Sequence, residues 1–303
     1  MKAKVSGTKK KINGTTFLLM ITILLFVVMY AAGMIVFNDK GFAKPQMFLN
    51  LFISNAGLLV IAMGETIVMI TAGIDISVGS VTALVCMVAA NQMENHGASA
   101  YTALLMALVI GLLFGLVQGF LVSYLEIQPF IVTLAGMFFA RGMTTIVHTD
   151  PFNVQNKAFV ALKDTRVIVP GMGSVNRIGK YVDAYVEIGV IVALLIVVLM
   201  FVMLRWSKLG RAFYAVGGNK QSALMLGINV KRTRFLAQLF SGVLAGIAGY
   251  VYFLHVGSGS ASHATGMEMN AIASSIIGGT LLTGGVGNII GTFFGVLSLS
   301  TIQ

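Results

Sequence analysis

The sequence predicts an all-α polytopic membrane protein with about eight to ten transmembrane or half-spanning helices, some of them broken and rich in glycine. Composition gives the first indication, because 57% of the 303 residues are hydrophobic and only 10% are charged. An average soluble domain has roughly 25% charged residues, so this chain has too little polar surface to cover a water-soluble globule. Several apolar runs also reach about 20 residues, the length that crosses a hydrocarbon core of roughly 30 Å.

The first apolar run, 16–37, is longer than the apolar core of a signal peptide, so we expect it to be a retained span. Residues 1–15 then form a basic cytoplasmic tail, and residues 16–303 form one transmembrane domain. The further spans are expected at 48–72, 78–93, 100–122, 129–148, 183–204 and 235–256. From about Ala271 onward, glycines divide the apolar sequence into short pieces.

The net charge of +10 is concentrated in two places, because 12 of the 20 Lys and Arg residues lie in the N-terminal tail and in the loop 205–234. This asymmetry is typical of the cytoplasmic segments of a membrane protein and not of a nucleic-acid-binding protein. Six crossings separate the two segments, which places both on the cytoplasmic side. The connectors 91–99 and 149–182 then lie outside, although the latter carries five basic residues against the rule.

The sequence lacks the residues of common enzymatic and metal sites. The single cysteine, Cys86, excludes an intramolecular disulfide and a cysteine-based metal cluster. No GxxxxGK[ST] phosphate loop and no HExxH motif occurs, and the four histidines show no metal spacing. We therefore expect no cofactor and no metal on this chain.

The polar segment Gly210 to Ile228 predicts a short helix, Lys220 to Leu226, at a membrane face. Asn219 is a good N-cap, because its side-chain oxygen can accept a free N–H of the first turn. Gly227 can end the helix in the left-handed conformation, and Gly217 and Gly218 are expected to bend the backbone sharply before the cap. The alternative is a basic loop that only fixes the topology.

Two stretches are broken by glycine at corresponding places in the two halves of the chain. The first, 64–84, contains Glu65 and Asp75, and Ser77 can cap the apolar segment that follows. The second, 267–295, contains Asn270 and Ser274. Unwound backbone is tolerated at membrane depth only where it is buried or lines a cavity, so such pairs indicate a transport pathway. Alternatively, the two carboxylates lie at the interface and only hydrogen-bond a helix end.

Two glycine series are expected to serve packing. Glycine recurs at every fourth position at 111, 115 and 119 and again at 287, 291 and 295. This spacing puts small residues on one helix face, so that two backbones approach closely.

Several motifs together resemble the permease subunits of bacterial ABC importers for ribose and related monosaccharides. The likeness covers about residues 45 to 300 and is closest to permeases of the galactofuranose type. The matching residues are Gly73–Gly79, Pro129–Gly142 with Arg141 at the outer end of a span, Gly210-Arg211, Ala215–Asn219, Ala223, Gly227-Ile228, Ala273–Thr280 and Gly284–Gly287.

The resemblance implies a multi-pass permease domain, 16–303, in the bacterial cytoplasmic (inner) membrane, surrounded by lipid and moving a pentose or hexose, galactofuranose among the candidates. It implies a cytoplasmic ATPase subunit that holds ATP and Mg, a periplasmic or extracellular sugar-binding protein, and a second permease chain, identical or homologous. It implies no nucleic-acid partner. ATPase coupling is assigned to the loop 205–234 through Arg211, Gly217, Gly218, Asn219, Ala223 and Gly227. The translocation pathway is assigned to Glu65, Asp75, Ser77, Asn270 and Ser274.

Two other functions are weighed against this one. An ion-gradient-driven transporter would use Asp75 or Glu65 as a coupling-ion site, but that function leaves the segment 210–228 unexplained. An intramembrane serine hydrolase would need a hydroxyl within reach of a base, with Ser258 or Ser260 and His255 or His263 as candidates in a flexible external connector. Members of the resembled family continue past the equivalent of Gln303 with another hydrophobic span, so a C-terminal truncation is also expected.

Overall fold

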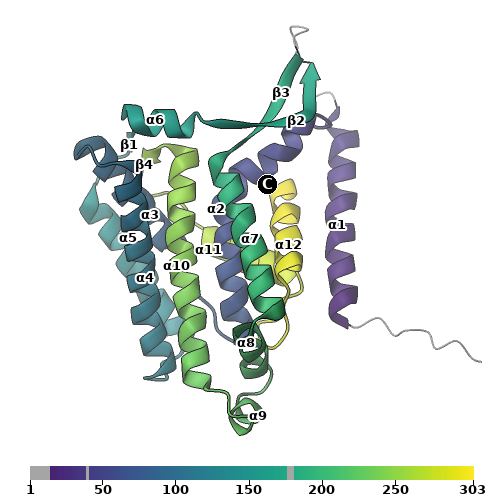
Figure 1. Ribbon diagram of the computed structural model, residues 1–303, viewed down its shortest axis with the longest axis vertical. Helices are drawn as coiled ribbons and strands as arrows, with labels where there is room; N and C mark the ends of the chain where they lie inside the picture. Colours follow the sequence, from purple (N-terminus) through teal and green to yellow (C-terminus); the bar gives the residue numbers. More distant parts are fainter. Residues whose placement is uncertain (1–13, 39–40, 176–180) are drawn as a thin grey trace, which may run out of the picture.

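The computed structural model of the protein describes residues 14–38, 41–175 and 181–303 (Figure 1). Long helices stand side by side and form a bundle. Six of the helices in the described residues are long and apolar enough to cross a membrane. They are α1 (Gly14–Val36), α2 (Pro45–Ile70), α4 (Ala100–Ser123), α5 (Pro129–Val147), α7 (Ile188–Trp206) and α10 (Val230–Val256). The helix α3 (Val78–Asn95) is shorter and follows the break after α2.

The chain alternates in direction along the bundle (Figure 1). The span predicted at 78–93 corresponds to α3, which is not among the six helices long and apolar enough to cross a membrane. The short helices α8 (Lys208–Gly218) and α9 (Lys220–Met225) lie at the same end as the start of α1. We call this the α9 end. The opposite end, here the hairpin end, carries the connection between α5 and α7. The loop 205–234 therefore lies at the same end of the molecule as the start of α1, while the lysines of the predicted basic tail, at positions 2 to 11, lie outside the described residues.

The described part of the connector 149–182 contains more secondary structure than the expected loop. It contains β1 (Phe152–Asn153), α6 (Lys157–Lys163) and the antiparallel hairpin of β2 (Arg166–Val175) and β3 (Tyr181–Glu187). The strand β1 pairs with β4 (Ser258–Gly259), which directly follows α10. The span expected at 183–204 therefore begins late, at Ile188, because residues 181–187 belong to β3.

The core lies around α2, since every residue from Ala56 to Ile70 is buried. The outward faces of α1, α4, α5 and α7 instead expose many large apolar side chains. This arrangement is the reverse of a water-soluble fold and suits a surface that faces lipid.

Glycine controls the closest helix contacts. A Cβ on Gly111 of α4 would collide with the carbonyl oxygen of Gly242 of α10, and one on Gly115 would lie 2.9 Å from the backbone of Leu239. The same holds between α11 (Met267–Ile277) and α12 (Ile289–Ile302), where Gly295 faces the carbonyl oxygen of Ser274. The packing predicted from the glycine spacing is confirmed for the series in α4 and for Gly291 and Gly295 in α12, whereas Gly287 lies before α12 and approaches Ile70 and Thr280 instead.

Candidate functional site

The helix α9 forms as the sequence predicts, with both ends capped. The side-chain oxygen Oδ1 of Asn219 accepts the N–H of Ser222 at 2.8 Å. The helix ends at Met225, one residue earlier than expected, and Gly227 follows with a φ of +77°. That left-handed conformation suits glycine, which has no Cβ to clash.

One side of α9 is anchored and the other is free. Ala223 is buried in a small cluster with Val216 of α8 and Val230 of α10. On the opposite side, Met225 is 87% exposed and Leu226 is 77% exposed. The coupling role assigned to Ala223 stays a prediction, and its burial means that it would act by holding α9 in place. This exposed apolar tip, which corresponds to the run Leu-Met-Leu at 224–226, was not predicted from the sequence.

Gly217 and Gly218 are helical, so the sharp bend expected there is wrong. They are the last two residues of α8, and the chain turns one residue later, at Asn219. The reason for glycine at 217 is close approach. A Cβ there would collide with the carbonyl oxygen of Ile70 at the end of α2 and lie 2.6 Å from the backbone nitrogen of Gly285. No atom lies within 4 Å of a Cβ built on Gly218.

The end of α8 therefore meets both broken stretches at one junction. The N–H of Gly285 donates to the carbonyl oxygen of Ile70 at 2.8 Å, and the hydroxyl of Tyr214 donates to the carbonyl oxygen of Gly287 at 2.9 Å. Figure 1 shows α8 beside the lower end of α2 and the loop that precedes α12. Backbone contacts join α8 to these two segments with almost no intervening side chain.

Asp75 is the centre of a buried polar network in the break between α2 and α3. Its carboxylate accepts the N–H of Ser77 at 3.0 Å and the Ser77 hydroxyl at 2.6 Å through Oδ1, and the Ser241 hydroxyl of α10 at 2.8 Å through Oδ2. The side-chain amide of Gln118 of α4 donates to Oγ of Ser77 at 2.9 Å. The side chain of Ser77 does not cap α3 as expected, because it is engaged in this network.

Glu65 extends the network along α2. Its Oε1 accepts the backbone N–H of Asp75 at 3.3 Å, while its Oε2 is buried and has no hydrogen-bond partner among the described residues. Both carboxyl groups are enclosed, with Asp75 only 1% exposed. Burial within the protein does not fix their depth in the membrane, and Asp75 accepts the N–H of Ser77 at the start of α3, so the alternative in which the carboxylates hydrogen-bond a helix end stays open. Their proposed role in a pathway stays a prediction.

Asn270 and Ser274 lie on the same helix but in different surroundings. Asn270 borders a cavity of about 300 Å³ near the hairpin end, together with Asn55, Tyr252, His263 and other polar side chains. Ser274 is fully buried where α11 packs against α12, and its hydroxyl has no partner among the described residues. Of the five predicted pathway residues, only Asn270 borders this cavity.

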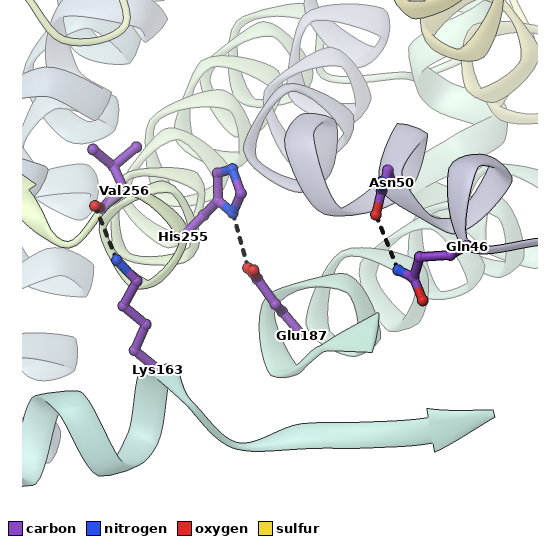
Figure 2. Close-up of polar contacts among 6 residues, drawn as sticks. All are labelled: Gln46, Asn50, Lys163, Glu187, His255 and Val256. Carbon is purple, nitrogen blue, oxygen red and sulfur yellow. Dashed lines mark hydrogen bonds and ion pairs between the residues drawn. The ribbon is translucent and has the colours of Figure 1, made fainter. Parts of the chain in front are cut away.

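Polar contacts tie the hairpin end to the bundle, as Figure 2 shows. Lys163 donates to the carbonyl oxygen of Val256 at 3.1 Å, and Nδ1 of His255 lies 2.9 Å from Oε2 of Glu187. Gln46 of α2 bonds Asn50 at 2.9 Å and also accepts the backbone N–H of Tyr185 of β3 at 2.8 Å. The connector between α5 and α7 is thereby fixed as a platform over α2 and α10.

The serine and histidine that a hydrolase would need come close, but they lack further catalytic features. Oγ of Ser258 lies 3.1 Å from Nε2 of His263, and burial lowers the pKa of the His263 ring. Among the described residues, the histidine that pairs with a carboxylate is His255, whose partner is Glu187. His263 has no such partner there, so no acidic group orients its ring. Arg141, predicted at the end of a span, donates to the carbonyl oxygens of Ala261 and His263 and thus holds this loop.

Comparison with known proteins identifies one family over most of the chain. The family model described as "Branched-chain amino acid transport system / permease component" matches residues 47–303. No solved structure matches this chain.

Similar proteins cover nearly the whole chain. The fructose import permease protein FruG of Bifidobacterium longum is 34% identical over 303 residues, which is 99% of this chain and 86% of that protein. The inner membrane ABC transporter permease protein YjfF of Escherichia coli is 38% identical over 285 residues, 94% of this chain and 82% of that protein. The D-allose transport system permease protein AlsC of Escherichia coli is 32% identical over 296 residues, 96% of this chain and 82% of that protein.

Proposed function

This chain belongs to the family of ABC importer permease components, and we propose that α9 receives the ATPase while the cavity at Asn270 receives the transported sugar. The chain is the membrane-spanning permease subunit of a monosaccharide importer and not an enzyme. Importers of this kind work with an ATPase and a substrate-binding protein. Both rival functions, the ion-driven transporter and the serine hydrolase, are therefore set aside.

The exposed tip of α9 is the observation that carries the docking proposal. Large apolar side chains outside a membrane span normally mark an interaction surface, and Met225 and Leu226 project from a helix that Ala223 holds firmly. A groove on the ATPase would cover them. ATP and Mg would bind to that partner. The α9 end would then face the cytoplasm together with the N-terminus, and the platform at the hairpin end would meet the sugar-binding protein.

The lining of the cavity favours a neutral cargo. Its polar groups are amides, hydroxyls and one imidazole, and its lining contains no Asp, Glu, Lys or Arg. A sugar needs hydroxyl-matching donors and acceptors, whereas the ammonium and carboxylate of an amino acid need charged or strongly polar partners. We therefore favour a monosaccharide such as fructose, D-allose or a galactofuranose over the branched-chain amino acids of the family's description. A second permease chain would complete the pathway.

Uptake by cells that carry the complete importer tests the cargo. Radiolabelled fructose, D-allose and galactofuranose would be compared with leucine, and we expect one sugar to accumulate while leucine does not compete. Uptake should stop when the ATPase carries an inactivating substitution and should continue when a protonophore removes the ion gradient. Leucine uptake would refute the cargo, and loss of uptake on adding the protonophore alone would refute ATP-driven transport.

Thiol chemistry tests the docking surface and the orientation. The native thiol, Cys86, is buried and is not expected to react. A cysteine introduced as Met225→Cys would be exposed, so it would be the thiol that a reagent or cross-linker reaches among the described residues. Tyr101→Cys is the matched control, since Tyr101 is 85% exposed at the other end of the bundle. We expect Met225→Cys to cross-link to the ATPase and Tyr101→Cys not to. In intact cells an impermeant thiol reagent should label Tyr101→Cys alone, and the reverse pattern would overturn the proposed orientation.

A further inference from the structure

A cavity of about 660 Å³ lies at the α9 end between α7, α8 and the loop that precedes α12. It belongs neither to the exposed tip of α9 nor to the cavity at Asn270. Figure 1 shows α8 below α7 and beside that loop. Two arginines line the cavity, Arg205 from α7 and Arg211 from α8, and Tyr214 closes it toward Gly287.

The positive charge of this cavity has no acidic counterpart among the described residues that line it. The lining contains no Asp or Glu. Among the described residues, the ion pair formed by a lysine or arginine joins Lys231 to Glu126, which lie outside this cavity. Arg211 uses Nη1 to bond the carbonyl oxygen of Trp206 at 3.3 Å, and a guanidinium has five N–H donors in all. Two arginines therefore line a space to which no described residue contributes an anion.

The position of the cavity corresponds to a membrane surface. The helix α7 is the most apolar of the six candidate spans, and Val198, Leu199 and Val202 are exposed along it. It ends in Arg205 and Trp206, and Trp206 is 63% exposed. Tryptophan gathers at the level of lipid headgroups, where its ring is half in apolar surroundings. The arginines thus lie at headgroup depth, with Phe201 and Ile289 as apolar lining.

We propose that this cavity binds the headgroup phosphate of an anionic phospholipid. The planar guanidinium fork matches phosphate oxygens, and basic pockets between transmembrane helices bind anionic headgroups in this way. A free phosphate offers the same oxygens but cannot use the apolar lining. The bound lipid would brace α8 against the loop 284–287. The coupling role that the sequence assigns to Arg211 stays a prediction, and the lipid contact is proposed beside it.

The single tryptophan of the sequence makes the test direct, because its fluorescence reports lipid next to the cavity. The full chain would be placed in nanodiscs of phosphatidylcholine that contain a small fraction of brominated phosphatidylglycerol or, in parallel, of brominated phosphatidylcholine. Each arginine near an anionic surface contributes about 1 kcal/mol. We therefore expect phosphatidylglycerol to be enriched about 30-fold around Trp206, seen as much stronger quenching than with the zwitterionic lipid.

Matched variants separate the outcomes. Arg205→Gln with Arg211→Gln should reduce the quenching to that of the zwitterionic lipid, while Arg232→Gln, an exposed arginine of α10 outside this cavity, should not. Equal thermal unfolding in pure phosphatidylcholine would show that the double variant is folded. Equal quenching by the two lipids would overturn the proposal. So would recovery of fluorescence on adding inorganic phosphate, which indicates a free-anion site. Unchanged lipid preference in the double variant, with loss of ATPase retention, would assign the arginines to an acidic partner surface.

Discussion

Replacing Gly217 with alanine is expected to disrupt the junction between α8 and the two broken stretches. The new methyl group would collide with the carbonyl oxygen of Ile70 and lie 2.6 Å from the nitrogen of Gly285, whereas nonbonded atoms rest at about 3.5–4.0 Å. Both obstacles are backbone atoms, so no side chain can rotate away. The adjacent Gly218 is the control, because its Cβ would meet nothing within 4 Å.

The two substitutions differ mainly in the collision. Both glycines belong to α8, so alanine improves helix propensity at each by up to about 1 kcal/mol. Forcing one extra methyl group into a packed site costs about 1–3 kcal/mol. Because the propensity gain is common to both variants, Gly217→Ala should be less stable than Gly218→Ala by about 1–3 kcal/mol.

The free energy of unfolding would be measured by denaturant titration in mixed micelles, and sugar uptake would be measured in cells with equal amounts of each variant in the membrane. We expect Gly217→Ala to lose stability and uptake, and Gly218→Ala to retain both. Equal stability of the two variants would refute the argument that close backbone approach explains glycine at 217. Equal loss of uptake without a stability difference would mean that the glycines act at the ATPase surface instead.

Three further substitutions follow from the site. Asp75→Asn should lower the free energy of unfolding, measured by denaturant titration, by about 1–3 kcal/mol. The reason is that the amide NH₂ takes the place of a carboxylate oxygen that accepts hydrogen bonds from hydroxyl and N–H donors. An unchanged free energy would contradict a stabilising role of these hydrogen bonds. Ala223→Glu should abolish uptake and cross-linking to the ATPase by displacing α9 from Val216, while the exposed Ser222→Glu keeps both. Asn270→Leu should raise the half-saturating sugar concentration about 5–10-fold through loss of a hydrogen bond. A concentration series of uptake measures this effect, and cross-linking at α9 should not change.

The sequence predicts the local features well where one residue type has one physical use. Asn219 caps α9 and Gly227 adopts a left-handed backbone after it, because these conformations depend on neighbouring residues only. The glycine series in α4 likewise predicts close packing against α10. Six of the seven expected spans follow from apolar length, which needs no tertiary information, while the span expected at 78–93 forms α3, which is not among the helices long and apolar enough to cross a membrane.

The remaining features depend on contacts between distant residues. A double glycine is typical of a bend, yet Gly217 is helical because Ile70 and Gly285 touch it. Ser77 stands at a helix start, yet its side chain turns to Asp75 and Gln118 because both are buried beside it. The β-branched and aromatic residues of 181–187 are typical of a strand. Residues from 183 onward were nevertheless assigned to a membrane span from the sequence, because they lead into an apolar run. Sequence patterns also give Asn270 and Ser274 equal weight, although only one of them borders a cavity.

The junction at Gly217 gives α9, the proposed docking helix, a route by which it would act on both halves of the domain. A displacement of α9 passes to α8 through the buried contact of Ala223 with Val216. From α8 it reaches the end of α2 and the loop at Gly285 through backbone contacts. Backbone contacts have no rotamers to absorb the movement, so the segments move together or separate. The end of α2 leads directly into the break that Asp75 holds. A movement that the proposed ATPase contact imposed on α9 would therefore reach the two places where the helices are interrupted.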